Sequence, residues 1–381
     1  MPLAPFDSSL SDDERVLVEA ARDFARSELL PLDRKWDEDE TSVVGILPQL
    51  ADMGLMNLCL PPEVNGLGCS YRAYAAILHE IAWASPSTMV TLSVHNMVGC
   101  ILDACAREPQ RTEWLSTWGS AESLAAFALT EANAGSDAAA VRATAAPTEG
   151  GYLANGEKMW ITNGMHARWF LTLLRVPGRD AKASLTAFLI DGRQPGIERT
   201  HIHGKMGIRG SETAVISLTD VFIPQDHVVG ELGEGLKVLL TTLNEGRIGI
   251  ATQASGIAEA CLDEMTAYAR ERVQFGQPIG NFQAVGNMIA DSAVELEAAK
   301  VLIWNAATHV DRGVKLPAAS SMAKLYATEA ANRIAYRAVQ VHGGSGYVRE
   351  FRVEQLYRDA RVTTIYEGTS EVQRIVIGRG L

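Results

Sequence analysis

The sequence predicts a multidomain α+β protein with an α-helical domain at each end and a β domain between them. Two observations lead to this prediction. The period of the apolar residues changes from helical to strand-like and back, and Gly/Pro turns accompany the changes. The expected domains are an N-terminal α-helical domain (1–122), a middle antiparallel β domain (123–230) and a C-terminal α-helical bundle (231–381). A chain of 381 residues is long enough for two or three such domains.

The first domain opens with a helix-start signal. Ser11 precedes the run DDERVLVEAARDF, in which acidic residues crowd the first turn and apolar residues recur every three or four positions. Residues 81–102 contain no Asp, Glu, Lys or Arg and are long enough to cross a membrane. Pro86, His95, Asn96 and several Ser and Thr residues dilute this apolar run. We therefore expect a helix that is buried inside the protein.

The middle domain is expected to be an antiparallel sheet, either a small barrel or a sandwich. Short β-rich runs occupy 151–162, 168–176, 184–191 and 212–223 and are separated by turn dipeptides. Asn155-Gly156 predicts a tight hairpin turn inside the first run.

Helical periodicity returns in the last domain. Long Ala-rich segments cover roughly 232–271, 281–312 and 317–341, and a last pair follows residue 350. Short loops between such helices predict an antiparallel bundle of about four helices.

Charge and cysteine content exclude several classes of protein. The formal charge of −12 without a basic block disfavours binding to nucleic acid or to an anionic membrane. The five cysteines form no CxxC pair and indicate a reducing compartment. Because the N-terminal residues resemble neither a signal peptide nor a transit peptide, we expect a cytoplasmic protein.

Motifs for common cofactors are missing. No GxGxxG follows a strand, and there is no Walker loop or GxSxG elbow. His201 and His203 could share a metal, but a lone HxH pair is more often a surface feature, and we expect no metal.

Four segments each allow a structural and a functional interpretation. FALTEANAGSD (127–137) and KMWITNG (158–164) are a strand with its turn and a hairpin strand, or else hydroxyl, N–H and indole groups beside a polar heterocycle. Two further segments are ERVQFGQPI (271–279) and QVHGGSGYVRE (340–350). They either end one helix and begin the next, or they lie close to a diphosphate and a ring.

Glu367 also has two possible roles. With Thr364 it fits the spacing of a capping box, which would make it a capping carboxylate. Alternatively, it is a general base, because loss of hydration between Tyr366 and Gly368 would raise the proton affinity of the carboxylate. The residues alone favour the cap.

Together and in this order, these segments resemble the acyl-CoA dehydrogenase family. The resemblance covers nearly the whole chain and is carried by LTEANAGSD, MWITNG, KMGIRGSET, ERVQFGQPI, QVHGGSGYVRE and IYEGTSEVQR. It implies a C-terminal four-helix bundle, FAD as cofactor and the α,β-dehydrogenation of an acyl-CoA thioester to the trans-2-enoyl-CoA. It also implies electron-transfer flavoprotein as the electron acceptor and assembly as a homotetramer.

The resemblance assigns roles to individual residues. Glu367 would take the α-proton while the β-hydrogen leaves as hydride to flavin N5, and Gly368 would lie against the thioester. The residues expected at the flavin of the same subunit are Phe127, Leu129, Thr130, Gly135, Ser136, Trp160, Ile161, Thr162, Thr369 and Glu371. Those expected at a neighbouring subunit's FAD are Arg272, Gln283, Gln340, Gly343 and Gly344, and Phe275 is a further expected cofactor contact. The CoA part of the substrate is expected to contact Ser136, Asn244 and Arg247.

Some branches of this family carry the base in the segment that matches LNEGR (243–247). Here Gly246 occupies that position, and its neighbour Glu245 should point about 100° away around the helix. Glu367 therefore remains the expected base.

The resemblance also narrows the substrate. Members that take glutaryl-type acids carry an Arg in the helix near Met89, whereas 88–105 contains no Lys or Arg here. Because an unpaired buried carboxylate is costly, we expect a neutral short-, medium- or branched-chain acyl-CoA.

Two other functions stay open. A flavin oxidase on the same scaffold would reduce O₂ directly, although the nitroalkane-oxidising branch uses Asp as its base. A non-catalytic relative that binds DNA would carry a basic C-terminal surface, which the net charge of −12 disfavours.

Overall fold

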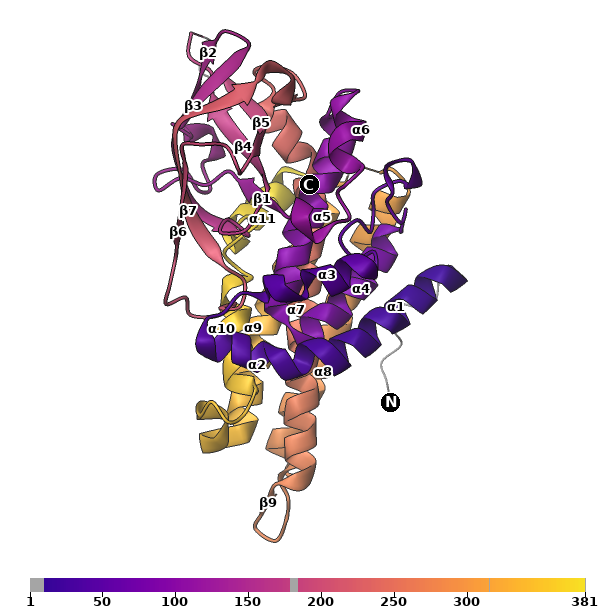
Figure 1. The fold of residues 1–381 in the computed structure, drawn as a ribbon. Helices are drawn as coiled ribbons and strands as arrows, with labels where there is room; N and C mark the ends of the chain where they lie inside the picture. The colour runs from indigo at the N-terminus through magenta and orange to yellow at the C-terminus, as the bar shows by residue number, and fades with distance from the viewer. Residues whose placement is uncertain (1–9, 179–183, 315, 381) are drawn as a thin grey trace.

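The structure is a computed structural model that describes residues 10–178, 184–314 and 316–380, with the side chains of 240–244 excepted. Figure 1 shows a body of packed helices with the sheet domain against one side of it. The order helical, β, helical along the chain confirms the predicted fold class.

The N-terminal helices begin and end near the predicted punctuation. They are α1 (Asp12–Phe24), which continues as a π-helical turn (Ala25–Leu29), α2 (Leu30–Asp39), α3 (Leu47–Asp52), α4 (Tyr71–Ala84), α5 (Pro86–Cys105) and α6 (Gln110–Leu115). Ser11 caps α1 as expected: its hydroxyl accepts from Glu14 N, and Glu14 Oε2 accepts from Ser11 N, 2.9 Å away.

Helix α5 is the one described helix that is long and apolar enough to cross a membrane, but most of its residues are buried within the protein. Its polar side chains bond internally. Asn96 accepts from Leu58 N at 3.0 Å and donates to Leu55 O, and His95 Nδ1 accepts from Ala125 N at 3.1 Å. The prediction of a buried core helix is confirmed.

Within the described residues, the middle domain contains an eight-stranded, mostly antiparallel sheet. Its strands are β1 (Ala125–Ala128), β2 (Thr144–Thr148), β3 (Gly151–Thr162), β4 (Trp169–Arg175), β5 (Leu185–Asp191), β6 (Ile197–His201), β7 (Thr213–Pro224) and β8 (Val228–Val229). The order is β6-β7-β3-β2-β4-β5-β8, and β1 pairs with β4 in parallel.

The hairpin predicted at Asn155-Gly156 is wrong. Strand β3 runs straight through this dipeptide, and the turn between β2 and β3 lies at residues 149–150. Gly156, with φ 138°, instead marks a register shift against β7, and the Asn155 side chain exchanges hydrogen bonds with Asp220. The dipeptide therefore makes a bulge rather than a chain reversal.

In the described part of the C-terminal domain the α-helices are α7 (Gly235–Glu271), α8 (Gln283–Asp311), α9 (Pro317–His342), α10 (Val353–Val362) and α11 (Ser370–Arg379). A small hairpin of β9 (Val273–Gln274) and β10 (Gln277–Pro278) joins α7 to α8 and lies at one end of the molecule (Figure 1). The Ala-rich faces of α7, α8 and α9 pack into a common core with α10. Small side chains let these long helices approach closely.

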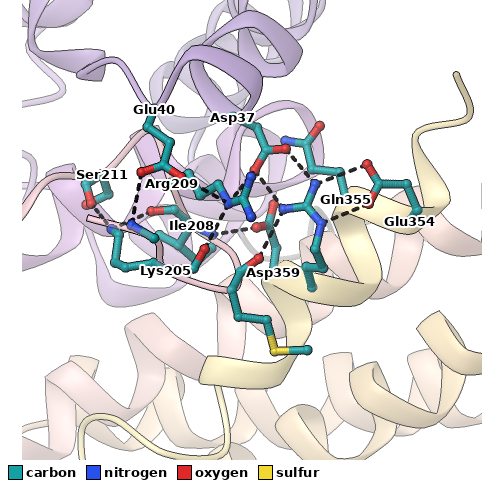
Figure 2. A network of polar contacts seen from close by, with 12 residues as sticks. Asp37, Glu40, Lys205, Ile208, Arg209, Ser211, Glu354, Gln355 and Asp359 are labelled. Carbon is teal, nitrogen blue, oxygen red and sulfur yellow. Dashed lines mark hydrogen bonds and ion pairs between the residues drawn. The ribbon is translucent and has the colours of Figure 1, made fainter. Parts of the chain in front are cut away.

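A polar network fastens the middle domain to the helices on both sides (Figure 2). The Arg358 guanidinium on α10 forms a two-point ion pair with Asp37 on α2, with Nη1–Oδ1 at 2.8 Å. Asp359 accepts from the N–H of Ile208, in the loop between β6 and β7, and Lys205 Nζ donates to Ile208 O at 2.7 Å. These contacts hold Ile208 at φ 51°, a backbone conformation that is unfavourable for a β-branched residue.

Candidate active site

Glu367 lies in the turn that connects α10 to α11. Glu367 and Gly368 both have positive φ, 52° and 89°, so the chain reverses sharply at this point. Thr369, not Thr364, caps α11, and its hydroxyl accepts from Val372 N at 3.3 Å. The interpretation of Glu367 as a capping carboxylate is therefore wrong, and its side chain is available for another role.

Glu367 is half-buried as a residue, and its Oε2 lies against Gly246 of α7. A Cβ atom on Gly246 would lie 3.0 Å from Glu367 Oε2 and 2.9 Å from Met97 Sδ. Oε2 is buried and has no hydrogen-bond partner among the described residues. Burial raises the pKa of Glu367, while the positive charges of Lys324 and Arg247 oppose that rise. A dry carboxylate with a raised pKa and an unused oxygen is suited to accept a proton.

Two side chains hold the turn around Glu367. Lys324 on α9 is fully buried, and its Nζ donates to Gly368 O at 2.8 Å. Gln373 on α11 donates from Nε2 to Gly368 O at 2.9 Å and to Glu367 O at 3.2 Å. The sequence-based prediction missed both residues.

Apolar side chains border the base. Val90 and Val94 of α5, Ile208 and Ile250 form a buried cluster, and Phe127, Val362 and Tyr366 pack against it. The Tyr366 hydroxyl donates to Gln253 Oε1, and Gln253 Nε2 donates to Pro86 O at 2.9 Å. Tyr366, the residue before Glu367, thus ties the turn to this apolar cluster and to α7.

The first set of expected flavin residues lies on two adjoining segments. Phe127 is on β1, and Leu129, Thr130, Gly135 and Ser136 follow it in a loop in which Gly135 and Ser136 are exposed. Met159 N on β3 donates to Thr130 O at 2.8 Å, which joins this loop to the strand that carries the other residues.

Trp160, Ile161 and Thr162 are at the end of β3. The register of β3 against β7 shifts between Lys158 and Ile161, and Trp160 has φ 61° within this bulge. The bulge leaves the Trp160 side chain 58% exposed, whereas Ile161 is buried. An exposed indole beside a loop rich in N–H and hydroxyl groups fits a flat polar ring such as a flavin.

A buried ion pair supports these segments. Glu131 Oε1 accepts from Lys158 Nζ at 2.8 Å, and its carboxylate also accepts from Arg142 N and Ala143 N. Lys158 donates in addition to Leu129 O and to Leu173 O. The prediction missed this pair because lysines in strands are usually exposed, and no sequence signal sets Lys158 apart.

The second set of expected flavin residues lies elsewhere in the chain. Arg272, Phe275, Gln283, Gln340, Gly343 and Gly344 are all exposed. Tyr268 stacks on His342 with ring centroids 4.2 Å apart and donates to Ser345 Oγ, which brings the end of α7 to the end of α9. This end, marked by β9 in Figure 1, is separated from the Lys324–Gly368 contact by about 28 Å along α9. Within one chain, the two sets of residues do not meet.

The remaining expected residues have separate positions. Thr369 caps α11, and Glu371 and Ser136 are exposed. Arg247 is only 7% exposed, and its charge acts on Glu367. The side chain of Asn244 lies outside the described residues.

Glu245 does not share the site of Glu367. Burial raises the pKa of Tyr71 on α4 and of Cys100 on α5, and the charge of Glu245 adds to both shifts, so Glu245 faces a different part of the core. Among the residues that the structure describes, no three His, Cys, Asp or Glu side chains are grouped as a metal site would need.

Comparison with known proteins agrees with this arrangement. The family models of the acyl-CoA dehydrogenase N-terminal, middle and C-terminal domains match residues 11–122, 126–221 and 233–381. An acyl-CoA dehydrogenase of Bacillus subtilis (strain 168) is 37% identical, with 98% of each chain covered. The mitochondrial short-chain specific acyl-CoA dehydrogenase of Homo sapiens is 39% identical over 97% of this chain and 90% of that protein.

A solved structure shows the same fold. Butyryl-CoA dehydrogenase from Megasphaera elsdenii superposes with a TM-score of 0.95 and 32% identity, covering 98% of this chain and 99% of that one. All three domains are thus present in their family order. The chain belongs to the acyl-CoA dehydrogenase family, whose members are FAD-dependent oxidoreductases.

Proposed function

We propose that this protein dehydrogenates a neutral short-chain acyl-CoA thioester to the trans-2-enoyl-CoA, with Glu367 as the base and FAD as the hydride acceptor. The observation that carries the proposal is the buried Glu367 carboxylate, which has a raised pKa and an oxygen without a hydrogen-bond partner. The α-proton of a thioester is only weakly acidic. A dry carboxylate of raised proton affinity is a stronger base toward it than a hydrated one.

The chain offers surfaces for both reacting partners. Phe127, the loop through Ser136 and the exposed indole of Trp160 would hold the flavin, which supplies hydride acceptance when bound. Glu367 would take the proton at its free Oε2. The apolar cluster that includes Val94 and Ile250 would exclude water from the carboxylate during this step.

Two observations support the proposed substrate class. No Lys or Arg occurs on α5, so a second carboxylate on the acyl chain would lack a partner there. A relative at 39% identity is specific for short chains by its name. We further propose electron-transfer flavoprotein as the electron acceptor, and a tetramer in which the exposed residues around Arg272 and Gly343 serve a neighbouring subunit's FAD.

The test is reduction of the flavin by substrate without oxygen. We expect the purified protein to be yellow and to bleach when butyryl-CoA is added, more slowly with longer acyl chains and not with glutaryl-CoA. Glu367→Gln should keep the colour and lose the bleaching. The matched control is Glu245→Gln, which removes a half-buried carboxylate that faces another part of the core, and this variant should still bleach.

Two results would overturn parts of this proposal. Full bleaching by Glu367→Gln would remove the assignment of the base. Hydrogen peroxide formed in air at the rate of turnover, without reduction of electron-transfer flavoprotein, would show that the protein is an oxidase.

A further inference from the structure

Lys324 is an unusual residue in the interior of the bundle. It lies on α9, its side chain is fully buried, and its Nζ donates to the carbonyl of Gly368 at 2.8 Å. A lysine is almost never fully buried unless its charge is compensated. We explain the burial of Lys324 by the turn that it contacts, because Gly368 in this turn directly follows the proposed base.

The turn itself needs external support. Two consecutive residues, Glu367 and Gly368, have left-handed backbone conformations, and for Glu367 this costs free energy. Both carbonyls are held from outside the turn, Gly368 O by Lys324 and Gln373, and Glu367 O by Gln373. Of these two side chains, only Lys324 also brings a charge.

The charges around the base come from three helices. Lys324 and Arg247 of α7 both lower the pKa of Glu367, against the larger effect of burial. The pKa of Lys324 in turn depends on the charges of Arg247, Glu371 of α11 and Glu329 of α9, in addition to that of Glu367. Burial lowers the pKa of Lys324 to about 8, so its charge is present at neutral pH and is lost above that value.

We propose that Lys324 is a positioning residue for proton abstraction: it fixes the turn that carries Glu367 and places a compensating positive charge beside the carboxylate. The part that concerns proton abstraction rests on the proposed function. The part that concerns the turn and the charge is a property of the folded chain and can be tested without any substrate.

The first experiment needs no catalysis. Lys324→Met should speed hydrogen exchange of the amides in 363–369 by about tenfold, because one hydrogen bond to the turn is lost. The control is Lys300→Met, which removes another buried lysine of the bundle that pairs with Glu259 far along the chain from the turn. Equal exchange in the wild type and in Lys324→Met would overturn the positioning role.

The second experiment measures the coupling between the two charges. In urea unfolding at pH 7, where Lys324 is charged, Lys324→Met should lower the midpoint less in the Glu367→Gln background than in the wild type, because the charge that Lys324 compensates is already gone. Equal shifts in both backgrounds would overturn the electrostatic part of the proposal.

The third experiment follows the rate of flavin bleaching by butyryl-CoA against pH. Without Lys324 the pKa of Glu367 rises, so the acid limb of the profile should move up by about one pH unit in Lys324→Met. Lys324→Arg keeps the charge and should keep the acid limb in place. An unchanged acid limb in Lys324→Met would contradict the proposal.

If Lys324→Met does not fold, Lys324→Gln replaces it in the same experiment, because its side-chain amide can still donate a hydrogen bond but carries no charge. The acid limb of Lys324→Gln should lie at higher pH than that of Lys324→Arg, since the pKa of Glu367 rises when the positive charge is removed. The same acid limb in both variants would overturn the proposal. If no acyl-CoA bleaches the wild type, the proposed function fails, while the exchange and unfolding results still test Lys324.

Discussion

The carboxylate of Glu367 occupies the space that a side chain on Gly246 would need. A Cβ atom at Gly246 would lie 3.0 Å from Glu367 Oε2, closer than ordinary van der Waals contact. Gly246 is therefore part of the site, because the absence of a side chain at this position leaves room for the Glu367 carboxylate against α7.

Gly246→Ala tests this relationship. The added methyl group should push the carboxylate out of its place, and a misplacement of about 1 Å costs about 100-fold in rate. Flavin bleaching by butyryl-CoA in stopped flow measures the loss. Gly378→Ala is the control, because Gly378 is also helical and has open space around its Cβ position. Unchanged bleaching in Gly246→Ala would show that the carboxylate adjusts freely.

The ion pair between Arg358 and Asp37 should contribute strongly to stability. Arg358→Met would leave Asp37 buried without its two-point partner and should cost about 3 kcal/mol in urea unfolding. Adding Asp37→Asn to that variant should restore part of the loss. The exposed pair of Arg374 with Glu329 offers a comparison, and Arg374→Met should cost less than about 1 kcal/mol. Equal losses from the two Arg variants would contradict this account.

Asp359 should make the protein less stable as pH rises. Burial raises its pKa from 3.8 to about 8, so between these values the folded chain holds a proton that the unfolded chain has released. The free energy of unfolding therefore falls as pH increases from about 4 to about 8. Asp359→Asn keeps an oxygen for Ile208 N but does not titrate, and it should flatten this dependence. Urea unfolding at pH 5 and at pH 8 measures the difference in the free energy of unfolding between these two pH values. The same difference in Asp359→Asn would show that other groups cause it.

The buried pair of Lys158 with Glu131 should link stability to flavin binding. Lys158→Met leaves Glu131 without its cation and frees the carbonyl of Leu129, so we expect a loss of about 3 kcal/mol and weaker retention of FAD. Glu131→Gln added to Lys158→Met should recover stability. Flavin fluorescence released during dialysis reports the binding. Tight flavin binding in Lys158→Met would show that the pair supports the core alone.

The helices and strands could be predicted because their patterns are local. Apolar spacing along α7, α8 and α9 and the alternation in β3 and β7 each report the face that is buried. Asn155-Gly156 misled the prediction because the same dipeptide suits both a tight turn and a bulge. The pairing of β3 with β7, which decides between them, is a contact between distant segments.

The support around the base was harder to predict. Lys324 is a charged residue in a helix, and such residues are usually exposed. One signal was present: its neighbours one turn away, Ser320, Ser321, Ala327 and Thr328, are all small, which is typical of a helix face packed in a core. The contact with Gly368 joins residues 44 positions apart, and no local pattern reports it. The cap spacing of Glu367 failed for a local reason, because the helix begins only at Ser370 and Thr369 takes the capping position.

Helix α10 carries Arg358, which donates to Met206 O, and Asp359, which accepts from Ile208 N, so both contact the middle domain. The helix ends only five residues before Glu367. A movement of the sheet relative to the helical domains would thus be transmitted to Glu367 through the one helix α10. Heat or denaturant that breaks these contacts of α10 should therefore abolish the activity before the C-terminal helices unfold.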